Sequence, residues 1–392
     1  MALPLVITLA VMTFAWPAGR ISPRDVPVGI VGTGAAGQAA VEGLTRQKPG
    51  AFDFRLYPDQ RAARSAIRNR DVYGAFAVSG GGITVLKATA ASPSVAQLLT
   101  DVGQQLADRA TQRMAARQKA AEQKAEEKAH GARSRAKAHQ QVAAGQGAVH
   151  AASPAKVLVQ GVDVVPLATA DPRGVVFSST VFPLTICGIL IGAFVTMARG
   201  LARPRHRVLT LLVACAIAAF GVHLVAQGFL GALPHHPLAT WAILALDLLS
   251  VSATAAGLIR LLGPVGLGLS AAVMVFAGNA FSGATSAPEL LPEGVDHVGQ
   301  WLPPGAGASL LRDTTYFDGA ADAGHLAVLA LWSICGITAV LFGHWVIREG
   351  RDTKGGAPAS GELLPATLPG SGTAVAVRRH AHAHARRHDG DD

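Results

Sequence analysis

Polar side chains that could carry a proton or an ion lie within long apolar stretches of this sequence. His223 and Gln227 are one helical turn apart in one stretch, and Asp247 lies near the middle of the next. Ionisable residues inside a membrane are rare and often belong to proton or ion pathways. We therefore consider His223, Gln227 and Asp247 a candidate relay. Hydrogen bonds that only hold neighbouring helices together are the alternative.

A helix-breaking segment at the end of a later apolar stretch is the second candidate. Glycines and prolines interrupt the chain there, and irregular backbone at membrane depth is tolerated only where it is buried in protein or lines a cavity. We expect either a re-entrant gate over 278–316 or a plain external loop with a short interfacial helix. The candidate gate and substrate path comprises Asn279, Ser282, Gly283, Pro288 and Pro292.

A glycine-rich motif follows the apolar segment 26–31. The sequence Gly32-Thr-Gly34-Ala-Ala-Gly37 matches G-x-G-x-x-G, and Asp59 follows about 20 residues later, as in dinucleotide-binding folds. Only half of such a fold fits before the chain changes character near residue 92. We therefore expect a tight turn that packs a helix on a strand.

Motifs for other chemistry are missing from the sequence. It contains no P-loop, no G-x-S-x-G nucleophile elbow, no H-E-x-x-H and no Cys/His zinc pattern. The three cysteines lie in apolar runs, where a small buried residue is the usual role. We expect no catalytic site, no cofactor, no metal site and no enzymatic activity of the chain itself.

The distribution of charge indicates a membrane protein. Of the 392 residues, 50% are apolar and 15% are charged, whereas about 25% is usual for a globular chain. The 173 residues of 174–346 contain only 13 charged side chains. The net charge of +9 is not arranged with aromatic residues, so we expect a lipid bilayer and no nucleic acid as partner. A simple cytosolic enzyme, a small disulfide scaffold and a wholly disordered chain are excluded.

Six stretches are apolar and about long enough to cross a bilayer, which takes about 20 helical residues. The fold class that we predict is therefore an α-helical polytopic membrane protein with an inserted α/β extracytoplasmic domain. The expected transmembrane helices are 1–16, a retained anchor, and about 175–198, 208–230, 238–262, 265–281 and 325–347.

Arginine content predicts the orientation of these helices. The loop 199–207 contains four Arg, whereas the loop 231–237 contains none. Because basic loops stay in the cytoplasm, we expect both termini to be cytoplasmic and 17–174 to be extracytoplasmic, in the cell membrane. The tail 348–392, rich in His and Arg, is expected to be disordered, with metal binding as the alternative.

The extracytoplasmic domain 17–174 is predicted from alternating apolar segments. We expect strands at 26–31, 52–57, 72–78 and 157–165, and a helix at 60–70. An Ala-rich segment mixed with charged residues strongly favours a helical arm at about 93–145. This arm is either a solvated helix or hairpin, or a stalk that pairs with a second copy or a partner.

A resemblance to a known family rests on three segments, which are Asn279 to Pro292, Trp301-Leu-Pro-Pro-Gly305 and 26–31. The chain resembles the actinobacterial members of the YhgE/Pip (phage infection protein) membrane family, which is related to ABC-2 type exporter permeases. The resemblance implies a permease subunit that moves an unidentified amphipathic substrate outward, as a homodimer or heterodimer driven by a separate P-loop ATPase. A non-transporting scaffold, receptor or secretion component that acts through its extracytoplasmic domain is the alternative. Proton-coupled efflux through Asp247 and His223 is a third hypothesis.

Overall fold

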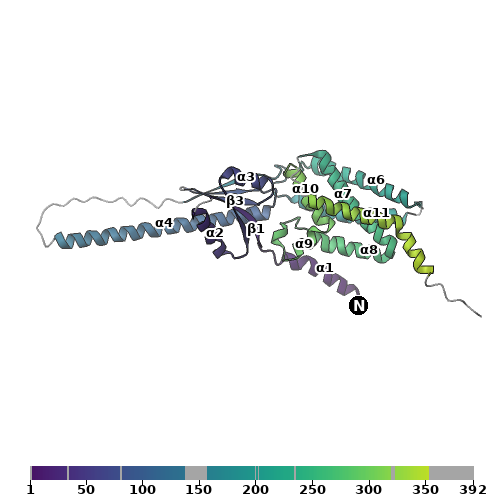
Figure 1. The fold of residues 1–392 in the computed structure, drawn as a ribbon, viewed down its shortest axis with the longest axis horizontal. Coiled ribbons are helices and arrows are strands. Elements are labelled where there is room, and N and C mark those ends of the chain that lie inside the picture. Colours follow the sequence, from purple (N-terminus) through teal and green to yellow (C-terminus); the bar gives the residue numbers. More distant parts are fainter. Residues whose placement is uncertain are drawn as a thin grey trace, which may run out of the picture. The chain divides into compact units, whose positions relative to one another are not determined.

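The chain combines a small β-sheet with a set of apolar helices, as a computed structural model shows (Figure 1). The structure describes residues 2–32, 35–79, 82–136, 157–198, 200–201, 203–233, 235–318 and 323–352. We call the described part of 26–165 the sheet domain. Most of the described residues are helical, which confirms a helical protein with a small α/β unit.

The sheet has five strands in the order β2-β1-β3-β4-β5. β1 is parallel to both β2 and β3, β4 forms an antiparallel hairpin with β3, and β5 is parallel to β4. The hairpin strand β4 was not predicted from the sequence. The strands are β1 (Val26–Val31), β2 (Phe52–Tyr57), β3 (Gly74–Ser79), β4 (Gly82–Lys87) and β5 (Leu158–Asp163).

Two short helices connect the parallel strands. α2 (Ala35–Gln47) joins β1 to β2, and α3 (Gln60–Arg68) joins β2 to β3. Because β2 and β3 flank β1 on opposite sides, right-handed connections place α2 and α3 on opposite faces of the sheet. The carboxylate of Asp59 accepts the Ala62 amide at 2.8 Å and caps α3, which gives this acid a structural role.

The predicted arm begins as part of the core of the sheet domain. α4 (Pro93–Ala136) is one helix, and its first turns bury Val95, Leu99 and Val102 against the sheet. Its side chains are mostly exposed after Met114, and Figure 1 shows the helix continuing beyond the strands. The solvated arm therefore begins about 20 residues later than predicted. The rest of the predicted arm, 137–145, lies outside the described residues.

Four helices of the described chain are long and apolar enough to cross a membrane by length and composition. Asp171 caps the first of them, because its carboxylate accepts the amides of Val175 and Val176 at 2.9 Å. The four are α5 (Val175–Met197), α6 (Pro204–His223) with its π-helical continuation η1 (Leu224–Phe229), α7 (Pro237–Leu262) and the apolar part of α11 (Ala323–Asp352).

The other two predicted transmembrane helices are shorter. α1 (Ala2–Ala18) has 17 residues, and α8 (Pro264–Ala271) with the π-helix η2 (Ala272–Asn279) has 16. At 1.5 Å per residue they extend roughly 25 Å, less than the roughly 30 Å of a bilayer core. Four of the six predicted spans are therefore supported among the described residues.

The segment between η2 and α11 contains three short helices. They are η3 (Pro288–Leu290), α9 (Val295–Gln300) and α10 (Pro303–Tyr316). All 14 residues of α10 are buried, and a Cβ on Gly307 would collide with the carboxylate of Asp247 in α7. The helix is therefore enclosed by protein, which differs from a plain external loop with an interfacial helix. α11 continues past the predicted end at 347 to Asp352, and the tail from 353 lies outside the described residues.

Candidate functional site

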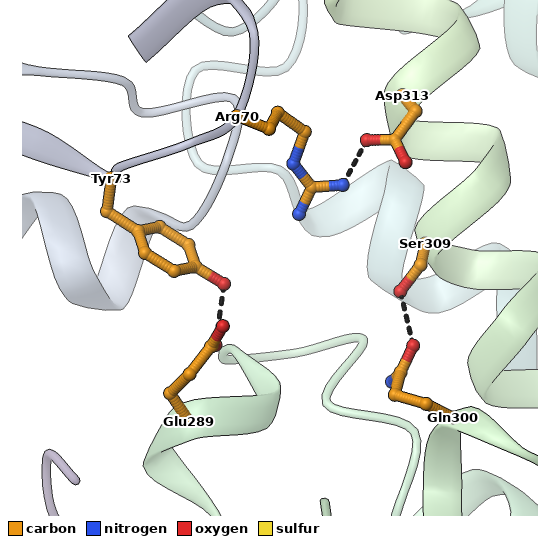
Figure 2. A network of polar contacts seen from close by, with 6 residues as sticks. All are labelled: Arg70, Tyr73, Glu289, Gln300, Ser309 and Asp313. Atoms are coloured by element: carbon orange, nitrogen blue, oxygen red, sulfur yellow. Dashed lines mark hydrogen bonds and ion pairs between the residues drawn. The ribbon is translucent and has the colours of Figure 1, made fainter. Parts of the chain in front are cut away.

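The C-terminal half of α10 meets the sheet domain at a buried ion pair. The Arg70 guanidinium pairs with the Asp313 carboxylate, and these side chains are 19% and 2% exposed (Figure 2). Burial alone would lower the pKa of Arg70, but the charge of Asp313 holds it above its ordinary value. Arg70 therefore remains a cation that joins two segments far apart in the sequence.

Arg70 owes its position to an unusual backbone conformation. It follows α3 with φ of 61°, and its amide donates to the Ile67 carbonyl while the Asp71 amide donates to the Ala66 carbonyl. These two bonds form the Schellman motif that ends many helices, where glycine is the usual left-handed residue. An arginine in this position accepts backbone strain and places its side chain toward α10.

A second polar contact lies beside the ion pair. The Tyr73 hydroxyl donates to the Glu289 carboxylate at 2.6 Å (Figure 2). Burial, and then the charge of Glu289, raise the pKa of Tyr73 well above its ordinary value, so the phenol keeps its proton. This bond joins the approach to β3 with η3.

The segment that follows α1 is bonded to the same loop. The Arg24 guanidinium donates to the Leu291 carbonyl at 2.6 Å, and the Ser22 amide donates to the Leu290 carbonyl at 3.1 Å. The Arg24 amide donates to the Glu289 carbonyl at 3.1 Å. Residues 22–24 and 289–291 thus pair along their backbones next to the Tyr73 contact.

Arg312, the residue before Asp313, is buried without a carboxylate of its own. Its guanidinium donates to the Ala284 carbonyl at 2.9 Å and lies 4.8 Å from the centre of the Phe177 ring. Burial, followed by the charge of Arg70, lowers the pKa of Arg312 to about 10. Arg312 is still a cation at neutral pH, and it holds the loop after η2 against α10.

The Arg70–Asp313 and Tyr73–Glu289 pairs line a cavity of about 590 Å³, which is within the size range of ligand sites. Across it, Ser309 donates to the side-chain oxygen of Gln300 at 2.7 Å (Figure 2). The Gln300 amide in turn donates to the Ser282 carbonyl at 3.0 Å. The polar residues lining the cavity are Asn69, Arg70, Tyr73, Glu289, Asp296, His297, Gln300, Ser309, Asp313 and His325.

The structure brings three predicted gate residues together. Asn279, Ser282 and Gly283 line a cavity of about 200 Å³ that α1 and α5 complete. The Thr185 hydroxyl donates to the Asn279 side-chain oxygen at 3.4 Å, so a side chain of α5 contacts the end of η2. Gly283 has φ of 65°, and a Cβ there would collide with the Pro288 backbone.

The two predicted prolines lie elsewhere. Pro288 begins η3 and lines the cavity of about 590 Å³. Pro292 is buried and lines neither of these two cavities. Of the five candidate residues, three therefore line one cavity, Pro288 lines the other, and Pro292 lines neither of the two.

Among the described residues, no hydrogen bond connects the side chains of the predicted relay. Asp247 Oδ1, His223 Nδ1 and Gln227 Oε1 are all buried, and none of these atoms has a hydrogen-bond partner among the described residues. Asp247 lies against Gly307 of α10. His223 is the last residue of α6 and Gln227 lies in η1, a π-helical turn of the kind that often occurs at functional sites.

Sequence reasoning missed the residues that form the larger site. Arg70, Tyr73, Asp313 and Gln300 carry no motif. The partners of Arg70, Tyr73 and Asp313 are also distant in the sequence. One signal was present, because Arg312 and Asp313 are adjacent charges in a region with few charges. Charged residues in such a region point to a functional site or a buried pair.

Comparison with protein-family models, with curated proteins and with solved structures finds no match to this chain. Within the described ranges, no three His, Cys, Asp or Glu side chains gather in a way that could hold a metal ion.

Proposed function

We propose that the chain is the membrane permease subunit of an ABC-2-like exporter that moves an amphipathic substrate outward. In this proposal α1 and the segment 264–281 complete six membrane helices, both termini are cytoplasmic and the sheet domain is extracytoplasmic. Arginine-rich loop 199–207 supports this orientation. A resemblance to the YhgE/Pip family supports the exporter assignment.

The buried helix α10 is the observation that carries the proposal. One part of it contacts Asp247, 10 residues into α7, and its C-terminal half is paired with the sheet domain through Asp313. Because α10 contacts both α7 and the sheet domain, it can transmit a movement of the sheet domain to the apolar helices. We assign α10 and the preceding loop the role of a gate, with the left-handed Gly283 as its hinge.

A separate ATPase supplies the energy in this proposal, because the sequence has no P-loop. Gentle solubilisation from native membranes is expected to recover a stoichiometric P-loop ATPase whose turnover rises with this subunit. The subunit would act in a homodimer or heterodimer. Recovery of the chain alone, or with envelope proteins only, contradicts the exporter proposal.

The gate assignment has a matched test in the same complex. Gly283→Leu is expected to abolish the stimulated ATP turnover, because a Cβ at 283 would collide with Pro288. Gly268→Leu is the control, since nothing lies within 4 Å of a Cβ at that helical position. Equal turnover in both variants, with equal amounts inserted in the membrane, contradicts the gate.

A second function, that of a scaffold or receptor, is favoured by α4. From 115 to 128 the surface of this helix is mostly exposed and is rich in charged side chains. Replacing residues 115–136 with a short linker removes the exposed part of α4 and leaves its buried turns intact. This variant therefore tests the arm alone. Loss of function in this variant, while Gly283→Leu remains active, supports the scaffold and contradicts the exporter.

A further inference from the structure

A second large hollow lies in the sheet domain, and the proposed function does not use it. Its volume is about 760 Å³, and it lies between α2 and α4 at the carboxyl ends of β1 and β3. It shares no lining residue with the cavity beside Arg70. We call it the arginine groove, after Arg46, Arg109, Arg113 and Arg117, which line it.

The floor of the arginine groove is apolar and partly open. Ile30 is in register with Phe76, and Val78 is in register with Ile83, so these four side chains share one face of the sheet. Val78 is nevertheless 60% exposed, and Met114 across the groove is 41% exposed. Apolar surface left open beside a hollow is typical of a site that receives an apolar ligand.

The rim of the arginine groove is strongly basic. Arg109, Arg113 and Arg117 recur every four residues on α4, which places them about 6 Å apart along one side of the helix. None of the three forms an ion pair with a described residue. On α2, the one described ion pair of Arg46 is with Glu42 at 3.7 Å, and because both side chains are exposed this pair is weak.

The position of the groove in the fold is one where ligands commonly bind. Connections from β1 to β2 and from β2 to β3 run in opposite directions, so the sheet has a switch point between β1 and β3. A dinucleotide at such a point needs an acid for its ribose, but the Asp59 carboxylate caps α3. The apolar floor therefore favours an acyl chain over a dinucleotide.

We propose that the arginine groove binds a single-chain anionic phospholipid. The acyl chain lies on the floor formed by Ile30, Phe76 and Val78, and the phosphate lies among the arginines. Arginine forms paired hydrogen bonds with phosphate oxygens, and a row of three provides more donors than one phosphate can use. This inference goes beyond the proposed export function, because binding in the groove requires neither transport nor an ATPase.

The test uses the full-length chain in phosphatidylcholine nanodiscs. The probe is lysophosphatidic acid with a 16-carbon chain that carries a diazirine, and mass spectrometry locates the crosslinks. We expect labelled peptides from β1, β3 and 106–117. Unlabelled lysophosphatidic acid should compete at least ten-fold better than lysophosphatidylcholine of the same chain length, and glycerol 3-phosphate should not compete.

Matched variants assign the binding to the groove. Changing Arg109, Arg113 and Arg117 together to Glu is expected to lower labelling at least ten-fold. The same charge change at Lys119, Lys124 and Lys128, which lie on α4 outside the groove, is expected to leave labelling unchanged. Val78→Asp places a carboxylate on the exposed part of the floor and should also abolish labelling.

Four results would overturn the proposal. They are equal competition by lysophosphatidylcholine, labelling confined to the membrane helices, protection by ADP in place of the lipid, and a dimer that excludes the probe. Failure here is distinguishable from failure of the exporter proposal, since co-purification of an ATPase is measured without the probe. A labelled groove without any ATPase would support the lipid site alone.

Discussion

The effect of Arg70→Gly on the free energy of unfolding depends on whether the ion pair with Asp313 stabilises the protein. The substitution is destabilising if the pair does so, and neutral or stabilising if it does not. Arg70 has φ of 61°, a conformation that costs an L-residue about 1–2 kcal/mol and that glycine adopts freely. Part of this gain is offset because glycine makes the unfolded chain more flexible, by about 0.5–1 kcal/mol. Without an ion pair, Arg70→Gly would leave the free energy of unfolding unchanged or raise it by about 1 kcal/mol.

The ion pair reverses the sign of this change, so that Arg70→Gly lowers the free energy of unfolding. Asp313 is 2% exposed, so removing its guanidinium partner leaves a buried charge unpaired, at a cost of about 3–5 kcal/mol. Together the two effects predict a net loss of about 2–5 kcal/mol in Arg70→Gly. Adding Asp313→Asn should recover much of this loss, because the double variant no longer buries an unpaired carboxylate.

The assay is denaturant unfolding of the purified full-length chain in detergent, with hydrogen exchange of α10 as a local measurement. Asp25→Gly is the matched control, because Asp25 also has a positive φ of 46° and its side chain is exposed. We expect Asp25→Gly to be neutral or stabilising and Arg70→Gly to be destabilising, with faster exchange in 309–316. If Arg70→Gly stabilises the protein as Asp25→Gly does, the reasoning about the buried pair is refuted.

Three further predictions concern other contacts. Gly307→Val should reduce folded protein on size exclusion because its side chain would collide with Asp247, and adding Asp247→Ala should restore part of it. Asp171→Ala should lower the free energy of unfolding by about 1–2 kcal/mol through loss of the α5 cap, whereas Asp171→Ser should lose less. In a 295 nm absorbance titration, all three tyrosines should ionise above pH 10, with Tyr316 at a pKa of about 12 because it is buried. Since the folded state holds these protons more tightly, stability is fully present below about pH 10 and falls as the pH rises toward 12.

The sequence was sufficient for elements whose signal is local. β1 and β2 begin and end at the predicted residues, and α7 (Pro237–Leu262) differs from the predicted helix by one residue. Apolar alternation and apolar length determine these elements directly. β4 (Gly82–Lys87) is as long as β1 and β2, but it directly follows β3 and a glycine run, so only its pairing with β3 identifies it.

The candidate site depends on contacts that no local pattern encodes. Arg70 and Asp313 are separated by 243 residues, and neither belongs to a recognisable motif. Their contact exists because α10 is enclosed next to the sheet domain, and that enclosure follows from tertiary packing. The adjacent charges Arg312 and Asp313 identified the region, but only the fold shows that one contacts a carbonyl and an aromatic ring and the other an arginine.

Ser282, one of the predicted gate residues, and the ion pair missed by sequence analysis belong to one series of contacts. The carbonyl of Ser282 accepts from Gln300, the Gln300 side-chain oxygen accepts from Ser309, and Ser309 lies one turn before Asp313, which pairs with Arg70. If this series couples the gate to the sheet domain, the coupling must act in both directions. Suppose that a lipid in the arginine groove shifts the equilibrium between the two states of the gate. The affinity of the lipid must then change when Gly283→Leu holds the gate in one state. Measuring probe affinity in that variant therefore tests the coupling without knowledge of the transported substrate.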